Sequence, residues 1–162
     1  MSFTFSHWRI ESHAGWKQIR ETGWTAKHGQ RYPMTKSTLR GISLRAGKCL
    51  LVEDQVRAGD PVDVLWGMIT RAKVKTDGPN AVLEQKGKVL YARILSPSGA
   101  VFQTRGADPP PPQHQQPEAT KLTVKLPAKV TELTLVVVLS TAKNALQQPF
   151  KPLAEWPGQI AE

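Results

Sequence analysis

The sequence predicts an all-β protein, an antiparallel two-sheet β-sandwich with little helix. Short apolar runs rich in β-branched and aromatic residues recur along the chain. Turn residues separate them at intervals of about 8–12 positions, and a helical period of apolar residues is almost absent. With 162 residues, of which 40% are hydrophobic and 22% charged, the chain is long enough for one domain with a sizeable core.

Residues 49–70 are the stretch around which the other predicted strands are arranged. They hold two apolar runs, 50–56 and 62–69, separated by a polar segment, 57–61, whose Gly and Pro favour a chain reversal. We therefore expect two strands around one turn. Alternate residues of the second run share one face of its strand: Val62, Val64, Trp66 and Met68. On that face, Trp66 is expected to be a large core anchor.

Further strand patterns lie on both sides of this stretch. They cover residues 39–44, 81–85, 88–95, 100–104, 120–126 and 133–139. Lys86 and Gly87 separate two of these runs and predict a tight hairpin. The run 133–139 is apolar on both faces, so we expect a central strand that is covered on both sides.

Composition divides the chain into three parts. Residues 1–38 are polar and aromatic and are expected to form an irregular segment, with 17–20 as a candidate short strand. Residues 39–140 form the expected sandwich core. Within it, residues 106–118 contain four consecutive prolines, which favour an exposed and extended loop. Residues 141–162 are expected to be a tail that wraps the surface.

The net charge of +9 and the pI of about 9.9 favour polyanionic partners such as nucleic acid, acidic polysaccharide or acidic lipid. A charge without any role in recognition is the alternative. Arg71, Lys73 and Lys75 alternate, so all three should point to one face of a strand. That face could follow a chain of sulfates, carboxylates or phosphates. A solubilising edge strand explains the same lysines equally simply.

Aromatic and metal-ligating residues give weaker indications. Trp16 and Trp24 are candidates for sugar binding, because Trp rings stack on apolar sugar faces, but they could equally cover a sandwich edge. His13, His28 and Asp54 are the only candidates for a metal, and their spacing matches no ligand signature. We therefore expect no cofactor. Asp54 is expected instead to be a turn or edge carboxylate that pairs with a nearby arginine.

The motifs of several enzyme classes are absent. The chain has no Gly-x-Ser-x-Gly elbow, no phosphate-binding Gly-rich loop and no dinucleotide fingerprint. Its one cysteine, Cys49, excludes an internal disulfide and a cysteine-based zinc cluster, and its place in a strand pattern predicts a buried thiol. No apolar run approaches the ~20 residues that span a bilayer, so no membrane partner is expected.

Taken in order from Tyr32, these strand patterns resemble the C-terminal β-sandwich domain of the heparinase II/III-like polysaccharide lyases. The residues that carry the resemblance are 39–44, 50–56, 63–70 with its Trp66, and 133–139. Members of that family pair an α/α toroid with this sandwich and cleave acidic polysaccharides by β-elimination. The resemblance implies a periplasmic or extracellular protein, with an acidic polysaccharide or a catalytic toroid as its partner.

Two departures from the family pattern restrict this implication. The chain has no room for the toroid, and it lacks the family's upstream His-Asn pair, because Trp, Ala, Gly and Gln follow its four histidines. No catalytic residue is therefore carried over, and we expect a detached or truncated ancillary domain that is inactive by itself. Two alternatives stay open: a structural or protein-interaction sandwich whose Pro-rich loop is the contact, and a basic nucleic-acid-binding domain.

Overall fold

The computed structural model describes residues 16–21, 35–45, 49–107, 118–143 and 151–155. Within these ranges the chain forms strands and a short 3-10 helix, η2 (Leu153–Glu155), and no α-helix. The strands are β1 (Trp16–Glu21), β2 (Thr35–Arg45), β3 (Cys49–Val62), β4 (Trp66–Thr70), β5 (Lys73–Asp77), β6 (Asn80–Gln85), β7 (Lys88–Ser96), β8 (Val101–Gly106), β9 (Thr120–Lys125) and β10 (Val130–Ser140).

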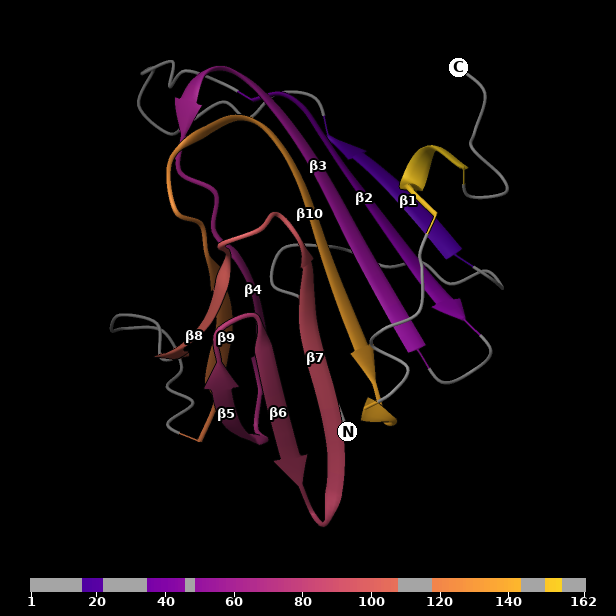
Figure 1. Cartoon of the computed structure of the whole chain (residues 1–162), viewed down its shortest axis with the longest axis vertical. Helices are drawn as coiled ribbons and strands as arrows, with labels where there is room; N and C mark the ends of the chain where they lie inside the picture. The colour runs from indigo at the N-terminus through magenta and orange to yellow at the C-terminus, as the bar shows by residue number, and fades with distance from the viewer. Residues whose placement is uncertain (1–15, 22–34, 46–48, 108–117, 144–150, 156–162) are drawn as a thin grey trace, which may run out of the picture.

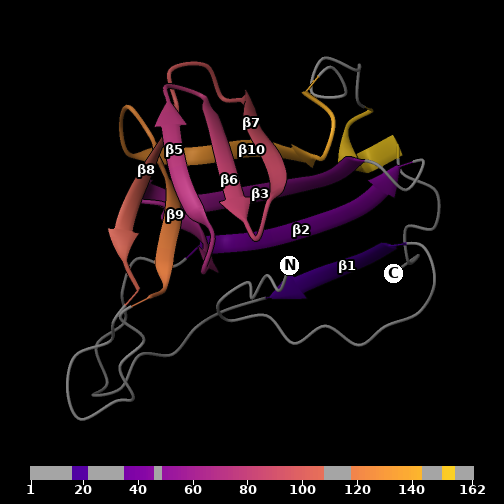
Figure 2. The same cartoon turned by 90° about the horizontal axis from the view of Figure 1, so that it is seen from below.

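The strands form two antiparallel sheets, which confirms the predicted all-β, two-sheet fold. A seven-stranded sheet has the order β1-β2-β3-β10-β7-β6-β5, and a three-stranded sheet has the order β4-β9-β8. The large sheet twists so strongly that β5, β6 and β7 run across the direction of β1, β2 and β3 (Figures 1 and 2). We call the face that each sheet turns toward the other its inner face, and the opposite face its outer face.

The main core lies between the two inner faces. Trp66 and Met68 of β4 are buried there, at 3% and 0% exposure, and the Trp66 ring packs at a tilt on Phe102 with 6.4 Å between ring centroids. This confirms Trp66 as a core anchor. The large sheet contributes alternate residues of β10, among them Leu135 and Val137. Val138, on the outer face of the same strand, is also fully buried, which confirms a central strand covered on both sides.

The predicted turn at residues 57–61 is wrong. β3 continues through this segment as one strand of 14 residues, and the chain leaves it only after Val62. The segment is held at its two ends: Arg57 and Ala58 pair with β2, and Val62 pairs with Val130 of β10. Gly59, Asp60 and Pro61 lie in the register shift between these pairs. Gly59 and Pro61 therefore make an irregularity within one strand rather than a reversal between two strands. The next strand, β4, belongs to the other sheet.

Other predictions are met more closely. β6 and β7 form the expected hairpin, with Lys86 and Gly87 at φ values of 50° and 71°, the positive angles that a tight two-residue hairpin turn requires. Cys49 is buried, as predicted. β1 lies within the 1–38 segment that was expected to be irregular, and β2 begins at Thr35 rather than at residue 39. The Pro-rich stretch 108–117 lies outside the described residues.

Candidate anion-binding hollow

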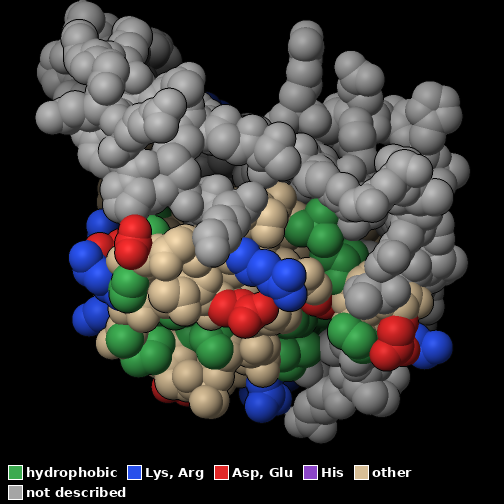
Figure 3. Space-filling view, turned by 90° about the horizontal axis from the view of Figure 1, so that it is seen from above, with side chains coloured by type: hydrophobic (Ala, Val, Ile, Leu, Met, Phe, Trp, Pro, Cys, Tyr) green, Lys and Arg blue, Asp and Glu red, His purple; other side chains and the backbone are tan. Residues whose placement is uncertain are grey.

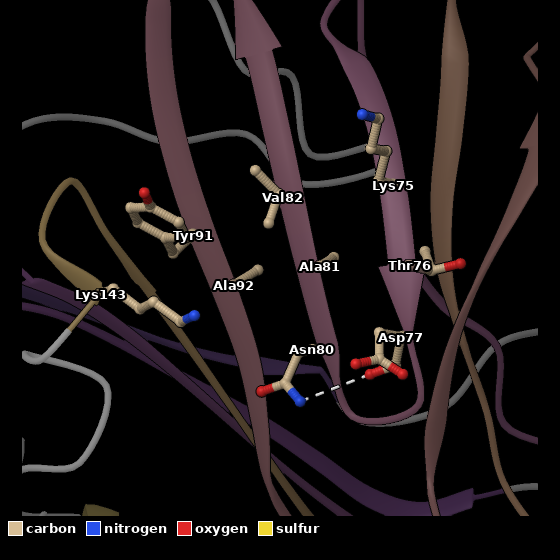
Figure 4. A pocket seen from close by; sticks show the side chains of 9 residues that line it. All are labelled: Lys75, Thr76, Asp77, Asn80, Ala81, Val82, Tyr91, Ala92 and Lys143. Atoms are coloured by element: carbon tan, nitrogen blue, oxygen red, sulfur yellow. Dashed lines mark hydrogen bonds between the residues drawn. The ribbon is translucent and has the colours of Figure 1, made fainter.

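A hollow of about 250 Å³ lies on the large sheet at β5, β6 and β7 (Figure 4). Its lining comes from these three strands and from the segment that follows β10. The residues are Lys75, Thr76, Asp77, Asn80, Ala81, Val82, Tyr91, Ala92 and Lys143. The hollow is therefore built from two parts of the chain about fifty positions apart in sequence, brought together by the pairing of β7 with β10.

Strand register places the key side chains in one row on the outer face. Lys75 faces Val82 across β5 and β6, and Val82 faces Tyr91 across β6 and β7. Because side chains alternate along a strand, the residues that follow or precede these three point toward the core instead. Ala81 and Ala92, for example, are buried in the core. The Tyr91 ring is half-buried and packs beside the outer-face cluster around Leu51 and Val138.

The β5–β6 turn forms the polar end of the hollow. Gly78 has a φ of 52°, a conformation that a residue with a Cβ adopts at a cost, and this allows the tight connection after Asp77. The Asn80 side-chain amide donates to the Asp77 carbonyl oxygen at 3.4 Å. The turn thus holds an amide and a carboxylate at the edge of the hollow, where they can exchange hydrogen bonds with hydroxyl groups of a ligand.

Two exposed lysines give the hollow its positive charge. Lys75 and Lys143 approach it from different elements, with Tyr91 and Val82 between them (Figure 4). Neither lysine has an ion-pair partner among the described residues. The Asp77 carboxylate on the same lining forms no ion pair with either lysine, so both ammonium groups can pair with a sulfate or carboxylate of a ligand. The Tyr91 ring and the Val82 methyls offer a surface for the apolar face of a sugar.

The predicted site residues are only partly brought together. Lys73 and Lys75 are exposed on the outer face of edge strand β5, and Lys75 alone of the predicted basic residues lines the hollow. Arg71 is exposed at the bend between β4 and β5. Trp16 begins β1, but its side chain lies outside the described part of the structure, as does all of Trp24.

Sequence reasoning missed Tyr91 and Lys143. Tyr91 could have been found, because its place in a well-defined hairpin puts it on the same face as Lys75 once the strand order is known. Lys143 carries no such signal, since only the long-range pairing of β10 brings it near β6 and β7.

Asp54 forms a buried ion pair on the inner face of the large sheet. Arg40 lies directly opposite on β2, and its Nη2 donates to Asp54 Oδ2 at 2.8 Å while its Nε donates to Oδ1. Burial raises the pKa of Asp54 above its ordinary value of 3.8, although the Arg40 hydrogen bond and charge, and more weakly the Trp66 indole, act in the opposite direction. The predicted pairing with an arginine is confirmed, whereas the predicted turn or edge position is wrong, because β3 is an interior strand.

Asp54 and its neighbours among the described residues do not form a group of metal ligands. No group of three His, Cys, Asp or Glu residues suited to a metal occurs in the ranges that the structure describes. His13 and His28, the other two candidates, lie outside those ranges. Asp54 is engaged with Arg40, whose positive charge opposes a cation at the same carboxylate.

A second buried carboxylate, Glu53, holds the C-terminal segment on the outer face. Glu53 is 2% exposed, and its Oε2 accepts a hydrogen bond from the Leu153 backbone N–H at 2.9 Å. Gln55 donates to the other carboxylate oxygen at 3.0 Å. Leu153, at 3% exposure, packs there with Leu51 and Val138. Leu153 therefore covers part of the outer face.

Charge is otherwise dispersed on the end of the molecule that Figure 3 shows. There, basic side chains are scattered among polar and hydrophobic ones, and a basic group at the centre stands beside an acidic one. Local geometry must therefore provide any selective recognition, because the overall net charge alone attracts all polyanions. Among the described residues, no helix is long and apolar enough to cross a membrane.

The chain matches no known protein family and no curated protein.

Proposed function

We propose that this protein is an ancillary β-sandwich domain of a heparinase II/III-like polysaccharide lyase, which binds acidic polysaccharide and is not catalytic by itself. The lyase family is proposed from the strand patterns alone, and the observation that supports polysaccharide binding is the hollow at β5, β6 and β7. There, two lysines without carboxylate partners among the described residues flank an aromatic ring and an aliphatic side chain. Charge and a stacking surface in one place suit a sugar that carries sulfate or carboxylate groups.

The size of the hollow fits a short part of such a chain. At about 250 Å³ it is somewhat smaller than the roughly 300–1,000 Å³ of sites that enclose a drug-sized ligand. A sugar residue with its anionic substituent could lie over Tyr91, with Lys75 and Lys143 meeting charged groups and Asn80 meeting a hydroxyl. Further residues of the polysaccharide would extend along edge strand β5 past Lys73.

Affinity electrophoresis in gels that contain heparin, alginate or DNA, at two salt concentrations, tests this function. The proposal predicts retardation by an acidic polysaccharide that survives moderate salt better than retardation by DNA, because contacts to the ring add to the charge term. Stronger retention by DNA would favour the nucleic-acid alternative. No shift with any polyanion would leave a structural or protein-interaction module.

A matched pair of variants locates the binding site in the same assay. Lys75→Ala with Lys143→Ala removes both charges from the hollow. Lys86→Asn with Lys88→Ala removes the same number of charges at the far end of the β6–β7 hairpin, and Asn tolerates the positive φ of Lys86. We expect the first variant to lose at least about tenfold in affinity, equivalent to ~1.4 kcal/mol, and the second to lose much less. Equal losses would show that only net charge matters.

A further inference from the structure

A second hollow, larger than the first, lies on the outer face of the three-stranded sheet. Its volume is about 500 Å³, within the roughly 300–1,000 Å³ of ligand sites. The residues that line it come from β8, from β9 and from the segments beside them: Asp63, Val64, Leu65, Gln103, Arg105, Thr123, Val124, Lys125, Leu126, Pro127, Ala128 and Lys129. We call this hollow the small-sheet groove.

The groove has a polar floor. Thr123 of β9 is 1% exposed although it belongs to the outer face, and its hydroxyl donates to the Gln103 carbonyl oxygen at 3.2 Å. Gln103 lies directly opposite Thr123 in the β8–β9 ladder. The half-buried side chain of Gln103 offers an amide donor and an amide acceptor, the groups that recognise sugar hydroxyls.

Two cationic side chains, Arg105 and Lys125, lie on the same face as the Gln103–Thr123 pair. Arg105 and Lys125 are exposed on the same face of the sheet, two residues away from the Gln103–Thr123 pair in opposite directions. Neither has an ion-pair partner within the described ranges. Lys129 differs, because its Nζ lies 3.4 Å from Asp63 Oδ2. Arg105 and Lys125 are therefore the cations that can pair with anionic groups of a ligand.

An apolar wall completes the groove. Leu65 is 58% exposed, one of the largest exposures of a big hydrophobic side chain among the described residues. Pro127 lies exposed on the lining as well. Together they provide C–H surface for the apolar face of a sugar ring. A surface that offered only positive charge would not have this apolar contact. The groove thus repeats the chemistry of the first hollow with different residues.

The two hollows face away from each other. Lys75 and Tyr91 of the first hollow lie on the outer face of the large sheet, and Gln103 and Thr123 of the groove lie on the outer face of the small sheet, while the two inner faces bury one shared core. We propose that the small-sheet groove is a second site for the same sulfated or carboxylated sugar chain, so that one molecule binds two chains and cross-links them. This inference rests on the proposed function of the first hollow.

Light scattering with long-chain heparin, combined with calorimetry on a heparin-derived tetrasaccharide, tests the inference. We expect wild-type protein to bind two tetrasaccharides without scattering and to form scattering networks with the long chain. Arg105→Ala with Lys125→Ala should bind one tetrasaccharide and lose the scattering. Lys75→Ala with Lys143→Ala should do the same, while Lys86→Asn with Lys88→Ala should behave as wild type.

The outcomes separate this inference from the proposed function. If the Arg105 and Lys125 variant keeps two sites, or still cross-links the long chain, the groove is not a sugar site, and the first hollow is unaffected. If only the Lys75 and Lys143 variant keeps wild-type behaviour, the first hollow is wrong instead. No tetrasaccharide binding by the wild type overturns both. A polyglutamate peptide that displaces the tetrasaccharide from the groove at equal charge concentration would overturn the assignment to sugar.

Discussion

Replacing Asp54 by Asn should destabilise the protein strongly, because an NH2 donor then replaces one of the two carboxylate oxygens that accept hydrogen bonds from the buried Arg40 guanidinium. Both residues are nearly buried, at 7% exposure for Arg40 and 6% for Asp54, and two hydrogen bonds join their side chains. Removal of one partner from a buried ion pair costs about 3–5 kcal/mol. Asn keeps the shape of Asp and one acceptor oxygen, so the loss reports the second hydrogen bond to Arg40 rather than a cavity. A protonated Asp54 differs from Asn, because both of its oxygens can still accept from Arg40.

Replacing both partners by apolar residues of similar size should cost far less. Arg40→Met with Asp54→Leu places aliphatic groups next to Trp66, and exchanges of this kind are neutral or stabilising by roughly 1–4 kcal/mol in other buried pairs. Urea unfolding followed by Trp fluorescence at neutral pH measures both variants against wild type. A neutral Asp54→Asn, or a double variant as unstable as the single one, would refute the reasoning.

The same pair should also affect how stability depends on pH. Because the pKa of Asp54 is raised in the folded state, the folded protein binds more protons than the unfolded one between the ordinary value of 3.8 and the raised value. Ionised Asp54 therefore lowers the free energy of unfolding at a pH above its folded pKa. As the pH falls through that window, wild type should gain stability relative to the Arg40→Met, Asp54→Leu variant. A relative loss on acidification would show that Arg40, and not burial, dominates the pKa.

Three further substitutions test the fold in the same unfolding assay. Leu153→Ala should cost about 2–5 kcal/mol, because it opens a cavity over Leu51 on the outer face, and a loss under about 0.5 kcal/mol would mean that the tail is not docked there. Gly87→Ala should cost about 1–2 kcal/mol at its φ of 71°, and a neutral result would argue against that turn conformation. Arg57→Ala should cost at most about 1 kcal/mol, since its 3.1 Å contact with Glu132 is exposed, and a large loss would contradict that exposure.

Features that depend on local pattern could be predicted from the sequence. The Lys86-Gly87 hairpin follows from turn residues between two strand runs, and the central position of β10 follows from its apolar residues on both faces. Trp66 was identified as a core residue because alternate positions of its strand share a face. In each case a few neighbouring residues hold the information.

Features that depend on pairing between distant segments could not be predicted. Residues 57–61 contain the Gly and Pro of a turn, yet they continue β3, because β2 pairs with Arg57 and Ala58 and β10 pairs with Arg57 and Val62 at the two ends of the segment. Asp54 was recognised as an arginine's partner, but nothing local showed that it would be buried. Lys143 lines the hollow because β10, which precedes it, pairs with β7, and this pairing joins segments far apart in the sequence.

The most direct test of the proposed sugar site is a titration of ¹⁵N-labelled protein with the heparin tetrasaccharide. The amide signals of Asn80, Val82 and Tyr91 should shift with increasing ligand, and the shifts should vanish in the Lys75→Ala, Lys143→Ala variant while its remaining spectrum stays folded. Signals at those three residues that do not move at saturation, or that move equally in the variant, would contradict a binding site in this hollow.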